Sequence, residues 1–158
     1  MPKFSYSVAG HTPAATPTDI LTVRAPRNST LRLRRIRLSA LATTAGSMAF
    51  TLLKRTATDT GGTSTAPAIG ERQESATDSD AVVALYTANP TGLGTAGDIQ
   101  FTGRLFFNLV GSPHDVIEKS WDEDDGPVLA PGEYLALNLA GAAVPAGGIV
   151  DVDLEWEE

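Results

Sequence analysis

The residues best suited to covalent catalysis lie close together in the C-terminal half of the chain. Ser112, His114 and Asp115 have the three side-chain types of a hydrolase triad. Such a triad needs a nucleophile on a sharp turn, a base ordered by a third group, and an oxyanion hole. The chain has no G-x-S-x-G sequence, and sequence neighbours on a proline-containing loop seldom reach that geometry. We therefore predict no catalytic residues and no enzyme.

Two further stretches match ligand-binding loops only in part. Residues 92–97, GLGTAG, fit the dinucleotide pattern G-x-G-x-x-G, but that site needs a strand before it and a helix after it. Here a proline-containing turn precedes the glycines and a strand pattern follows them. Residues 122–125, all acidic, offer oxygen ligands for calcium, but the spacing matches an EF-hand loop incompletely. An exposed acidic loop is favoured there, and no metal or cofactor is predicted.

Basic residues are concentrated in the first third of the chain. Residues 1–55 contain nine of the twelve Lys and Arg residues and one acid, although the net charge of the whole chain is −7. The densest cluster consists of Arg32, Arg34, Arg35 and Arg37. Its strand has no aromatic side chains for stacking on bases, so direct nucleic-acid binding is not predicted. Two alternatives stay open: these arginines pair with acids of the same fold, or they bind an acidic neighbouring subunit.

The acidic counterpart of this cluster lies at the C-terminus. Over residues 149–156 apolar and acidic residues alternate with period two, which puts Asp151, Asp153 and Glu155 on one face of a strand. The apolar face is expected to enter the core. We predict that the arginine cluster and these three acids are interface residues, together with Phe4 and Tyr6 of the N-terminal segment.

Eight segments have the alternation or β-branched content of strands. They cover residues 4–8, 20–24, 30–41, 48–55, 81–87, 99–109, 133–139 and 149–156. Over 30–41 the apolar positions change parity at Arg34-Arg35, which predicts a β-bulge that keeps all four apolar side chains inward. No βαβ alternation or fixed repeat is visible. The predicted fold is therefore all-β, a single-domain antiparallel β-sandwich of about eight strands with a jelly-roll-like topology.

Chain length and composition set the expected domain organisation and location. At 158 residues the chain is most simply one domain, with residues 1–19 as an N-terminal arm or linker and 20–158 as the β-sandwich. There is no cysteine, so no disulfide is expected. No apolar run is long enough for a membrane span, and the N-terminus lacks the apolar core of a signal peptide. These features predict synthesis in the cytoplasm and no membrane partner.

Five segments, in their order along the chain, resemble a group of tailed-bacteriophage virion proteins. The segments are TGGTSTAP, ALYTANPTGLGT, GRLFFNL, PGEYLALNL and PAGGIVDVDLEW. They are similar to small β-sandwich proteins of the head decoration (cement) or head-fibre type, from about residue 30 to the end. The resemblance implies a jelly-roll-like fold, a homo-oligomer with a trimer favoured, and attachment to the major capsid protein or neighbouring virion subunits. It supplies no defined site residues.

The expected function follows from this resemblance and from the charge layout. We expect a non-enzymatic capsid decoration protein on the virion surface that binds and stabilises the lattice of the major capsid protein. The alternative is a tail- or fibre-associated or receptor-binding β-sandwich that recognises carbohydrate. For that alternative Trp121, in the long acidic connection, is the best aromatic platform.

Overall fold

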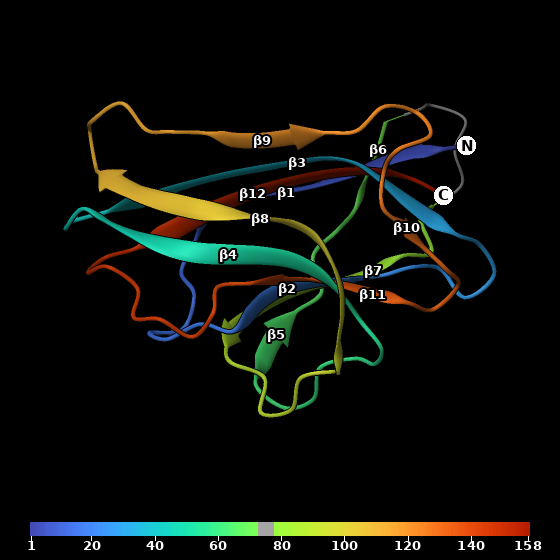
Figure 1. Ribbon diagram of the computed structural model, residues 1–158, viewed down its shortest axis with the longest axis horizontal. Coiled ribbons are helices and arrows are strands. Elements are labelled where there is room, and N and C mark those ends of the chain that lie inside the picture. The colour runs from blue at the N-terminus through green and yellow to red at the C-terminus, as the bar shows by residue number, and fades with distance from the viewer. Residues whose placement is uncertain (73–77) are drawn as a thin grey trace.

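The computed structural model describes residues 1–72 and 78–158, and their regular structure is entirely β (Figure 1). Within these residues, no helix is long and apolar enough to span a bilayer. The strands are β1 (Lys3–His11), β2 (Asp19–Arg24), β3 (Leu31–Ala42), β4 (Gly46–Arg55), β5 (Thr63–Thr65), β6 (Gly70–Glu71), β7 (Val82–Ala88), β8 (Ala96–Leu109), β9 (Ile117–Ser120), β10 (Val128–Leu129), β11 (Tyr134–Asn138) and β12 (Ile149–Glu157).

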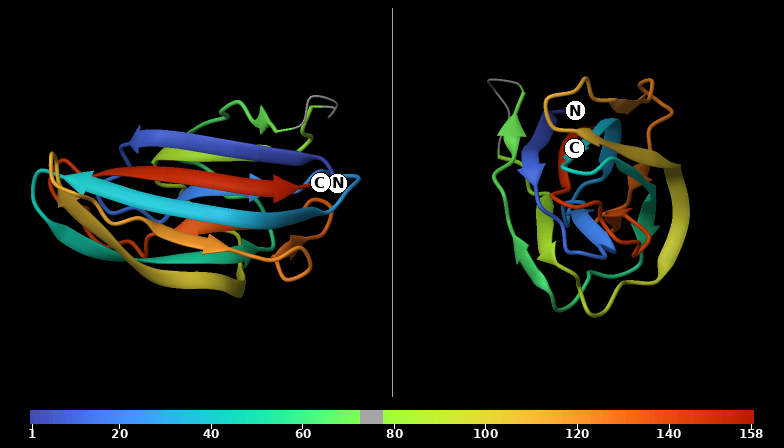
Figure 2. Two further views of the ribbon diagram at one scale, coloured as in Figure 1. Left: turned by 90° about the horizontal axis from the view of Figure 1, so that it is seen from above. Right: turned by 90° about the vertical axis from the view of Figure 1, so that its left-hand side faces the viewer.

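One continuous sheet contains all of these strands. Ten of them follow the order β5-β7-β2-β11-β4-β8-β3-β12-β1-β6, while β9 and β10 pair with β3 beside that path. The sheet is curled into a half-barrel whose two halves face each other (Figure 2). Strand β8 joins the halves, because it pairs antiparallel with β4 along most of its length and parallel with β3 at its end.

The core fills the space between the two halves of the curled sheet. Strand β12 shows why the sequence folds this way: its apolar residues, from Val150 to Trp156, are buried, whereas the alternating acids lie half-buried on the outer face. Burial of each such apolar side chain stabilises the fold by roughly 1.5–3 kcal/mol. The predicted alternation over 149–156 is confirmed.

All eight predicted segments are strands, but the predicted architecture differs from the observed one. The all-β prediction is confirmed, whereas the structure has twelve strands in one curled sheet rather than a sandwich of about eight. The four additional strands, β5, β6, β9 and β10, are short and lie outside the eight predicted segments. Their side chains are mostly exposed, so no apolar alternation marks them and only backbone pairing defines them.

The predicted bulge in the arginine-rich strand is confirmed. Between β3 and β12, Glu155 lies opposite Arg35 and the next residue, Trp156, lies opposite Leu33. Arg34 is therefore the extra residue. Because of it, the apolar residues on both sides of the parity change are buried, namely Leu31, Leu33, Ile36 and Leu38.

The N-terminal segment belongs to the sheet, in contrast to the predicted arm. Strand β1 lies beside β12, with Phe4 opposite Trp156 and Tyr6 opposite Leu154. Phe4 and Tyr6 are only 1% and 3% exposed. Both side chains are thus part of the core, and Phe4 also lines the groove described below. Phe4 and Tyr6 are buried because β1 pairs with β12, the C-terminal strand, which lies at the other end of the sequence.

Candidate functional site

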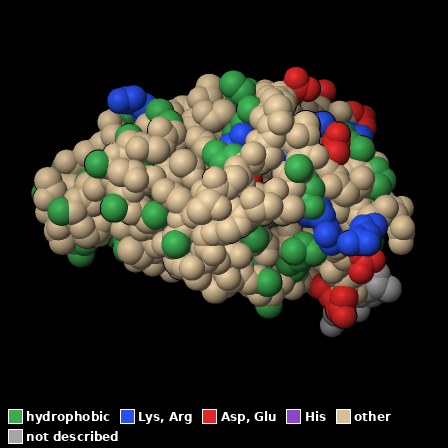
Figure 3. Space-filling view, turned by 90° about the horizontal axis from the view of Figure 1, so that it is seen from below, with side chains coloured by type: hydrophobic (Ala, Val, Ile, Leu, Met, Phe, Trp, Pro, Cys, Tyr) green, Lys and Arg blue, Asp and Glu red, His purple; other side chains and the backbone are tan. Residues whose placement is uncertain are grey.

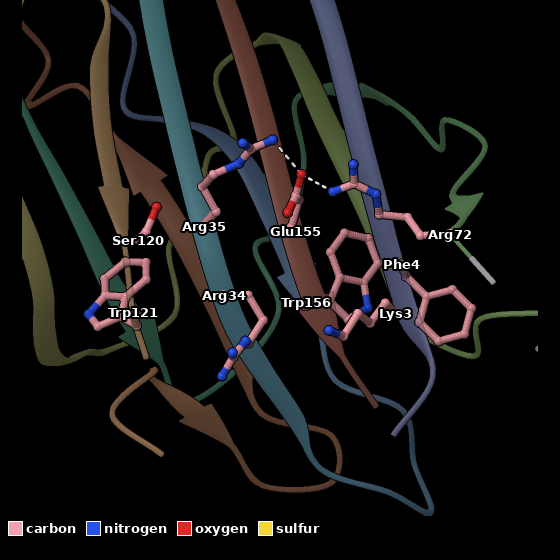
Figure 4. A pocket seen from close by; sticks show the side chains of 9 residues that line it. All are labelled: Lys3, Phe4, Arg34, Arg35, Arg72, Ser120, Trp121, Glu155 and Trp156. Atoms are coloured by element: carbon pink, nitrogen blue, oxygen red, sulfur yellow. Dashed lines mark hydrogen bonds and ion pairs between the residues drawn. The ribbon is translucent and has the colours of Figure 1, made fainter. Parts of the chain in front are cut away.

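A groove with charged walls lies on the outer face of β1, β12 and β3. Its volume is about 450 Å³. Its walls carry Lys3, Arg34, Arg35, Arg72, Glu155 and Trp121 (Figure 4). The opposite side of the molecule carries few charged side chains except near one end (Figure 3).

Local backbone structure positions the cations of the groove. The bulge in β3 inserts Arg34, so that two consecutive arginines, Arg34 and Arg35, both reach the groove instead of pointing to opposite faces. Arg72 follows β6, which pairs with β1, and its backbone N–H donates to the carbonyl oxygen of Lys3 at 2.9 Å. Glu155 projects from the outer face of β12 between them.

The basic and acidic rows of the sequence pair within one chain. Arg35 and Arg72 both contact the carboxylate of Glu155 (Figure 4). Arg35 also lies 3.4 Å from Asp153. Arg34 and Lys3 approach Glu157, at 3.6 and 3.7 Å respectively. Arg34 and Arg35 thus pair with acids of β12 in the same chain, as the first of the two alternatives predicts.

The remaining predicted interface residues also have partners inside the chain. Arg37 lies 3.4 Å from Glu118 of β9, and Arg32 lies 3.6 Å from Asp124. Asp151 accepts hydrogen bonds from the Ser39 hydroxyl at 2.9 Å and from a backbone N–H at 2.7 Å. The acidic loop over 122–125 is attached to β3 because Arg32 and Arg34 donate to the backbone carbonyl oxygens of Glu123 and Asp122, at 2.7 and 3.0 Å.

Three aromatic residues line the groove, and Trp121 is more exposed than the buried Phe4 and Trp156. It is half-buried and packs against the hydrophobic core, and its backbone N–H donates to the carbonyl oxygen of Arg34 at 3.0 Å. The ammonium group of Lys119 lies 5.7 Å from the centre of the indole ring. A fixed indole beside charged and hydroxyl groups can bind an apolar or sugar surface of a ligand, while the polar groups orient it.

A second hollow of about 470 Å³ lies on the same outer face and contains His114. The side chains that line it with His114 include Arg37 and Asp151. Ser112, His114 and Asp115 are all exposed, and in the described part of the chain no hydrogen bond joins them. The structure does not bring these three residues into a triad. The other histidine, His11, is buried, and burial lowers the pKa of its imidazole.

A buried cluster of titratable groups lies where β2 begins and β4 and β11 end. Arg55 donates to both carboxylate oxygens of Asp19, at 2.9 and 2.7 Å, and Asn138 donates to Asp19 at 2.6 Å. Asp59 is buried beside them and accepts from the Gly94 N–H at 3.3 Å. Burial, together with the negative charge of Asp19, raises the pKa of Asp59 to about 6.

Sequence reasoning did not identify this cluster. An arginine at the end of an amphipathic strand normally faces solvent, and Arg55 follows the apolar positions of β4 without any distinguishing pattern. A register shift between β4 and β8 at Leu53/Arg55 accompanies its inward position. The cluster does not line the groove, so we assign it a structural role in holding loops together.

No protein-family model, curated protein or solved structure matches the chain.

Proposed function

We propose that the protein is a non-enzymatic component of a bacteriophage particle, a capsid decoration protein that binds the lattice of the major capsid protein. As part of this proposal, we interpret the fold as a jelly-roll-like sandwich whose two layers are the two halves of the curled sheet. Resemblance to phage virion proteins in five ordered segments supports it. The groove over β1, β12 and β3 is the proposed contact surface.

The state of the charges in the groove is the observation that carries this proposal. Glu155 is held by Arg35 and Arg72, and Glu157 by Arg34 and Lys3. Both carboxylates are therefore already engaged by cations of the same chain. The groove presents a pre-organised polar surface around the half-buried indole of Trp121, which is typical of a recognition site.

Binding to particles tests the proposal. Particles that lack the protein are mixed with purified protein, and the bound fraction is measured by co-sedimentation. We expect wild-type protein to bind, and Trp121→Ala to weaken binding at least about tenfold, as expected for a central aromatic contact. Leu93→Ala, which removes an exposed apolar side chain outside the groove, is the matched control. Wild-type protein that stays in the supernatant would rule out attachment to the particle.

A second candidate function is carbohydrate binding by the same groove. The half-buried indole of Trp121 next to Ser120 and charged side chains favours it, because sugars bind with one apolar face on an aromatic ring and with hydroxyls on polar groups. A glycan array checks this function. Binding of a defined glycan that is lost in Trp121→Ala, with no particle binding, would favour this candidate over the capsid role.

A further inference from the structure

Two loops are held against each other beside the buried cluster at the start of β2. The loop over 56–62 connects β4 to β5, and the loop over 89–95 connects β7 to β8. The Thr60 N–H donates to the Gly92 carbonyl oxygen at 2.8 Å, and the Thr91 N–H donates to the Thr60 carbonyl oxygen at 2.9 Å. This pairing is an isolated bridge rather than a ladder, so further contacts have to keep the loops together.

Gly94 connects the second loop to the buried cluster. Its N–H donates to Oδ1 of Asp59 at 3.3 Å, and its carbonyl oxygen accepts from Nη1 of Arg55 at 3.0 Å. The two loops approach so closely here that a Cβ on Gly94 would lie 2.3 Å from the Ala57 carbonyl oxygen. Because Asp59 belongs to the first loop, its bond to Gly94 joins the two loops directly.

The cluster holds two carboxyl groups and one guanidinium. Arg55 donates to both oxygens of Asp19, which is 0% exposed. Asp59 is only 7% exposed and takes part in none of the ion pairs found among the described residues. Two ionised carboxylates beside one guanidinium would leave a net negative charge in the interior. A buried carboxyl group in that position binds a proton instead.

The proton has a defined place between Asp59 and Asp19. In the described residues Oδ2 of Asp59 is buried without a hydrogen-bond partner, and two ionised carboxylates cannot donate to each other. A proton on this oxygen makes Asp59 a donor to the Asp19 carboxylate. Burial, the negative charge of Asp19 and a hydrogen bond between the two side chains together raise the pKa of Asp59 to about 6.

Groups on three strands face Asp59. They are Asp19 of β2, Arg55 of β4 and Tyr86 of β7. Burial and the charges of Asp59 and Asp19 raise the pKa of the Tyr86 phenol above its usual value of about 10, so this phenol is neutral at physiological pH. Tyr134 and His11 both lie near Tyr86, and burial lowers the pKa of the His11 imidazole. His11 is thus another group that titrates in the acidic range, so a test has to separate it from Asp59.

We propose that Asp59 and Asp19 share one proton that latches the loops over 56–62 and 89–95 together, and that loss of this proton at neutral pH lets the two loops separate locally. With the proton present, Asp59 donates to Asp19 and keeps its bond to Gly94. Without it, two carboxylates repel each other beside one guanidinium, and the loop that carries Asp59 moves away from Gly94. This latch is separate from the groove and does not rest on the phage assignment.

The direction of the pH response follows from the two states of Asp59. Its pKa is about 6 with the loops closed and about 3.9 when an open loop exposes it to water. The closed form therefore holds more protons, and opening becomes more favourable as pH rises from about 4 to about 6. Between pH 4.5 and 7.5 these two values allow a roughly twentyfold increase in the opening equilibrium.

Amide hydrogen exchange followed by NMR tests the latch in the whole chain. Exchange rates are measured at about pH 4.5 and about pH 7.5 and corrected for the intrinsic pH dependence of exchange. In wild-type protein we expect protection of the loop amides to fall at least about tenfold at the higher pH. These amides are the N–H groups of Thr60, Thr91, Gly92 and Gly94. Amides that join β3 to β12 are the internal reference and should change much less.

Asp59→Asn separates the latch from other titrations. Asparagine supplies an N–H donor to Asp19 at any pH and has no carboxyl proton to lose, so the pH response of the loop amides should disappear. The variant keeps His11 and Tyr86, so a response that persists in it comes from another group and would overturn the proposal. Asp115→Asn, at an exposed position, is the matched control and should keep the wild-type response.

Carboxyl-carbon NMR shifts test the position of the proton independently. The Asp59 carboxyl carbon should titrate with a midpoint near pH 6, and that of Asp19 should show a smaller step at the same pH, as expected for a shared proton. A midpoint near pH 4 for Asp59 would overturn the proposal, as would equal protection of the loop amides at the two pH values. If the amides between β3 and β12 lose as much protection as the loops, the whole sheet responds and no local latch exists.

Discussion

Arg55 holds the carboxylate of Asp19 at two points in the protein interior. Its Nε and Nη2 atoms donate to the two oxygens of Asp19 at 2.9 and 2.7 Å, and Asp19 is 0% exposed. The remaining guanidinium nitrogen, Nη1, donates to the Gly94 carbonyl oxygen at 3.0 Å. One side chain therefore joins the end of β4, the start of β2 and the loop before β8.

Removal of this cation should destabilise the fold strongly. Arg55→Leu leaves the Asp19 carboxylate buried without its counter-charge, so we expect the free energy of unfolding to fall by about 3–5 kcal/mol. Urea denaturation followed by circular dichroism measures the change. Arg37→Leu removes an arginine whose pair with Glu118 is largely exposed, and it should cost less than about 1 kcal/mol. Equal losses in the two variants would contradict a special role for the buried pair.

Because the pKa of Asp59 is raised, replacing Asp59 with a neutral residue should increase the free energy of unfolding by an amount that depends on pH. Its pKa is about 6 in the fold, through burial and the charge of Asp19, and about 3.9 in an unfolded chain. Between these values the folded state holds more protons, so the contribution of Asp59 to stability falls as pH rises from about 4 to about 6. Above pH 6 it stays at that lower level.

Asp59→Asn should therefore be more stable than wild type at pH 8, by about 1–3 kcal/mol. The advantage should shrink towards pH 4, where the wild-type carboxyl is protonated in the fold. Thermal or urea unfolding at several pH values measures the difference between the two proteins. Asp115→Asn, at an exposed position, serves as the control and should show no such trend. An advantage that is independent of pH would contradict the proposed titration.

Deletion of the first strand should prevent stable folding. Removal of residues 1–11 takes away Phe4, whose ring centroid lies 6.3 Å from that of Trp156, and exposes the edge of β12. We expect loss of cooperative unfolding and of near-ultraviolet circular dichroism, since large buried aromatic residues contribute about 3–5 kcal/mol each. Deletion of residues 1–2 alone is the control and should leave the fold intact. A stable, cooperative protein without residues 1–11 would show that this segment is dispensable.

The bulge in β3 can be tested by shortening the strand by one residue. Deletion of Arg34 removes the extra residue, so that either Leu31 and Leu33 or Ile36 and Leu38 must turn outward. We expect a loss of at least about 3 kcal/mol in the free energy of unfolding. Arg34→Ala keeps the register and removes the contact with Glu157 and the hydrogen bond to the Asp122 carbonyl oxygen, so it should cost about 1 kcal/mol. Chemical denaturation of the two variants separates the effect of register from that of charge.

The sequence predicted the charged strand faces that form the groove, but not that these strands lie next to each other. Alternation placed the arginines of β3 and the acids of β12 on outer faces, because the direction of a side chain in a strand depends on local parity. Whether those rows meet depends on which strands become neighbours. Lys3 and Arg72 also reach the groove, although their segments have no pattern that links them to it.

The sequence alone determined the all-β class, eight of the strands and the bulge at Arg34, since each depends on the spacing of apolar residues within a few positions. Tertiary structure decided the partners of those strands. The two C-terminal strands, which are adjacent in sequence, do not pair with each other: β11 lies between β2 and β4, while β12 lies between β1 and β3. That choice buries Phe4, brings Arg35 to Glu155 and leaves the edge of β8 free. It depends on hydrogen bonds and packing between segments far apart in sequence, which no local pattern specifies.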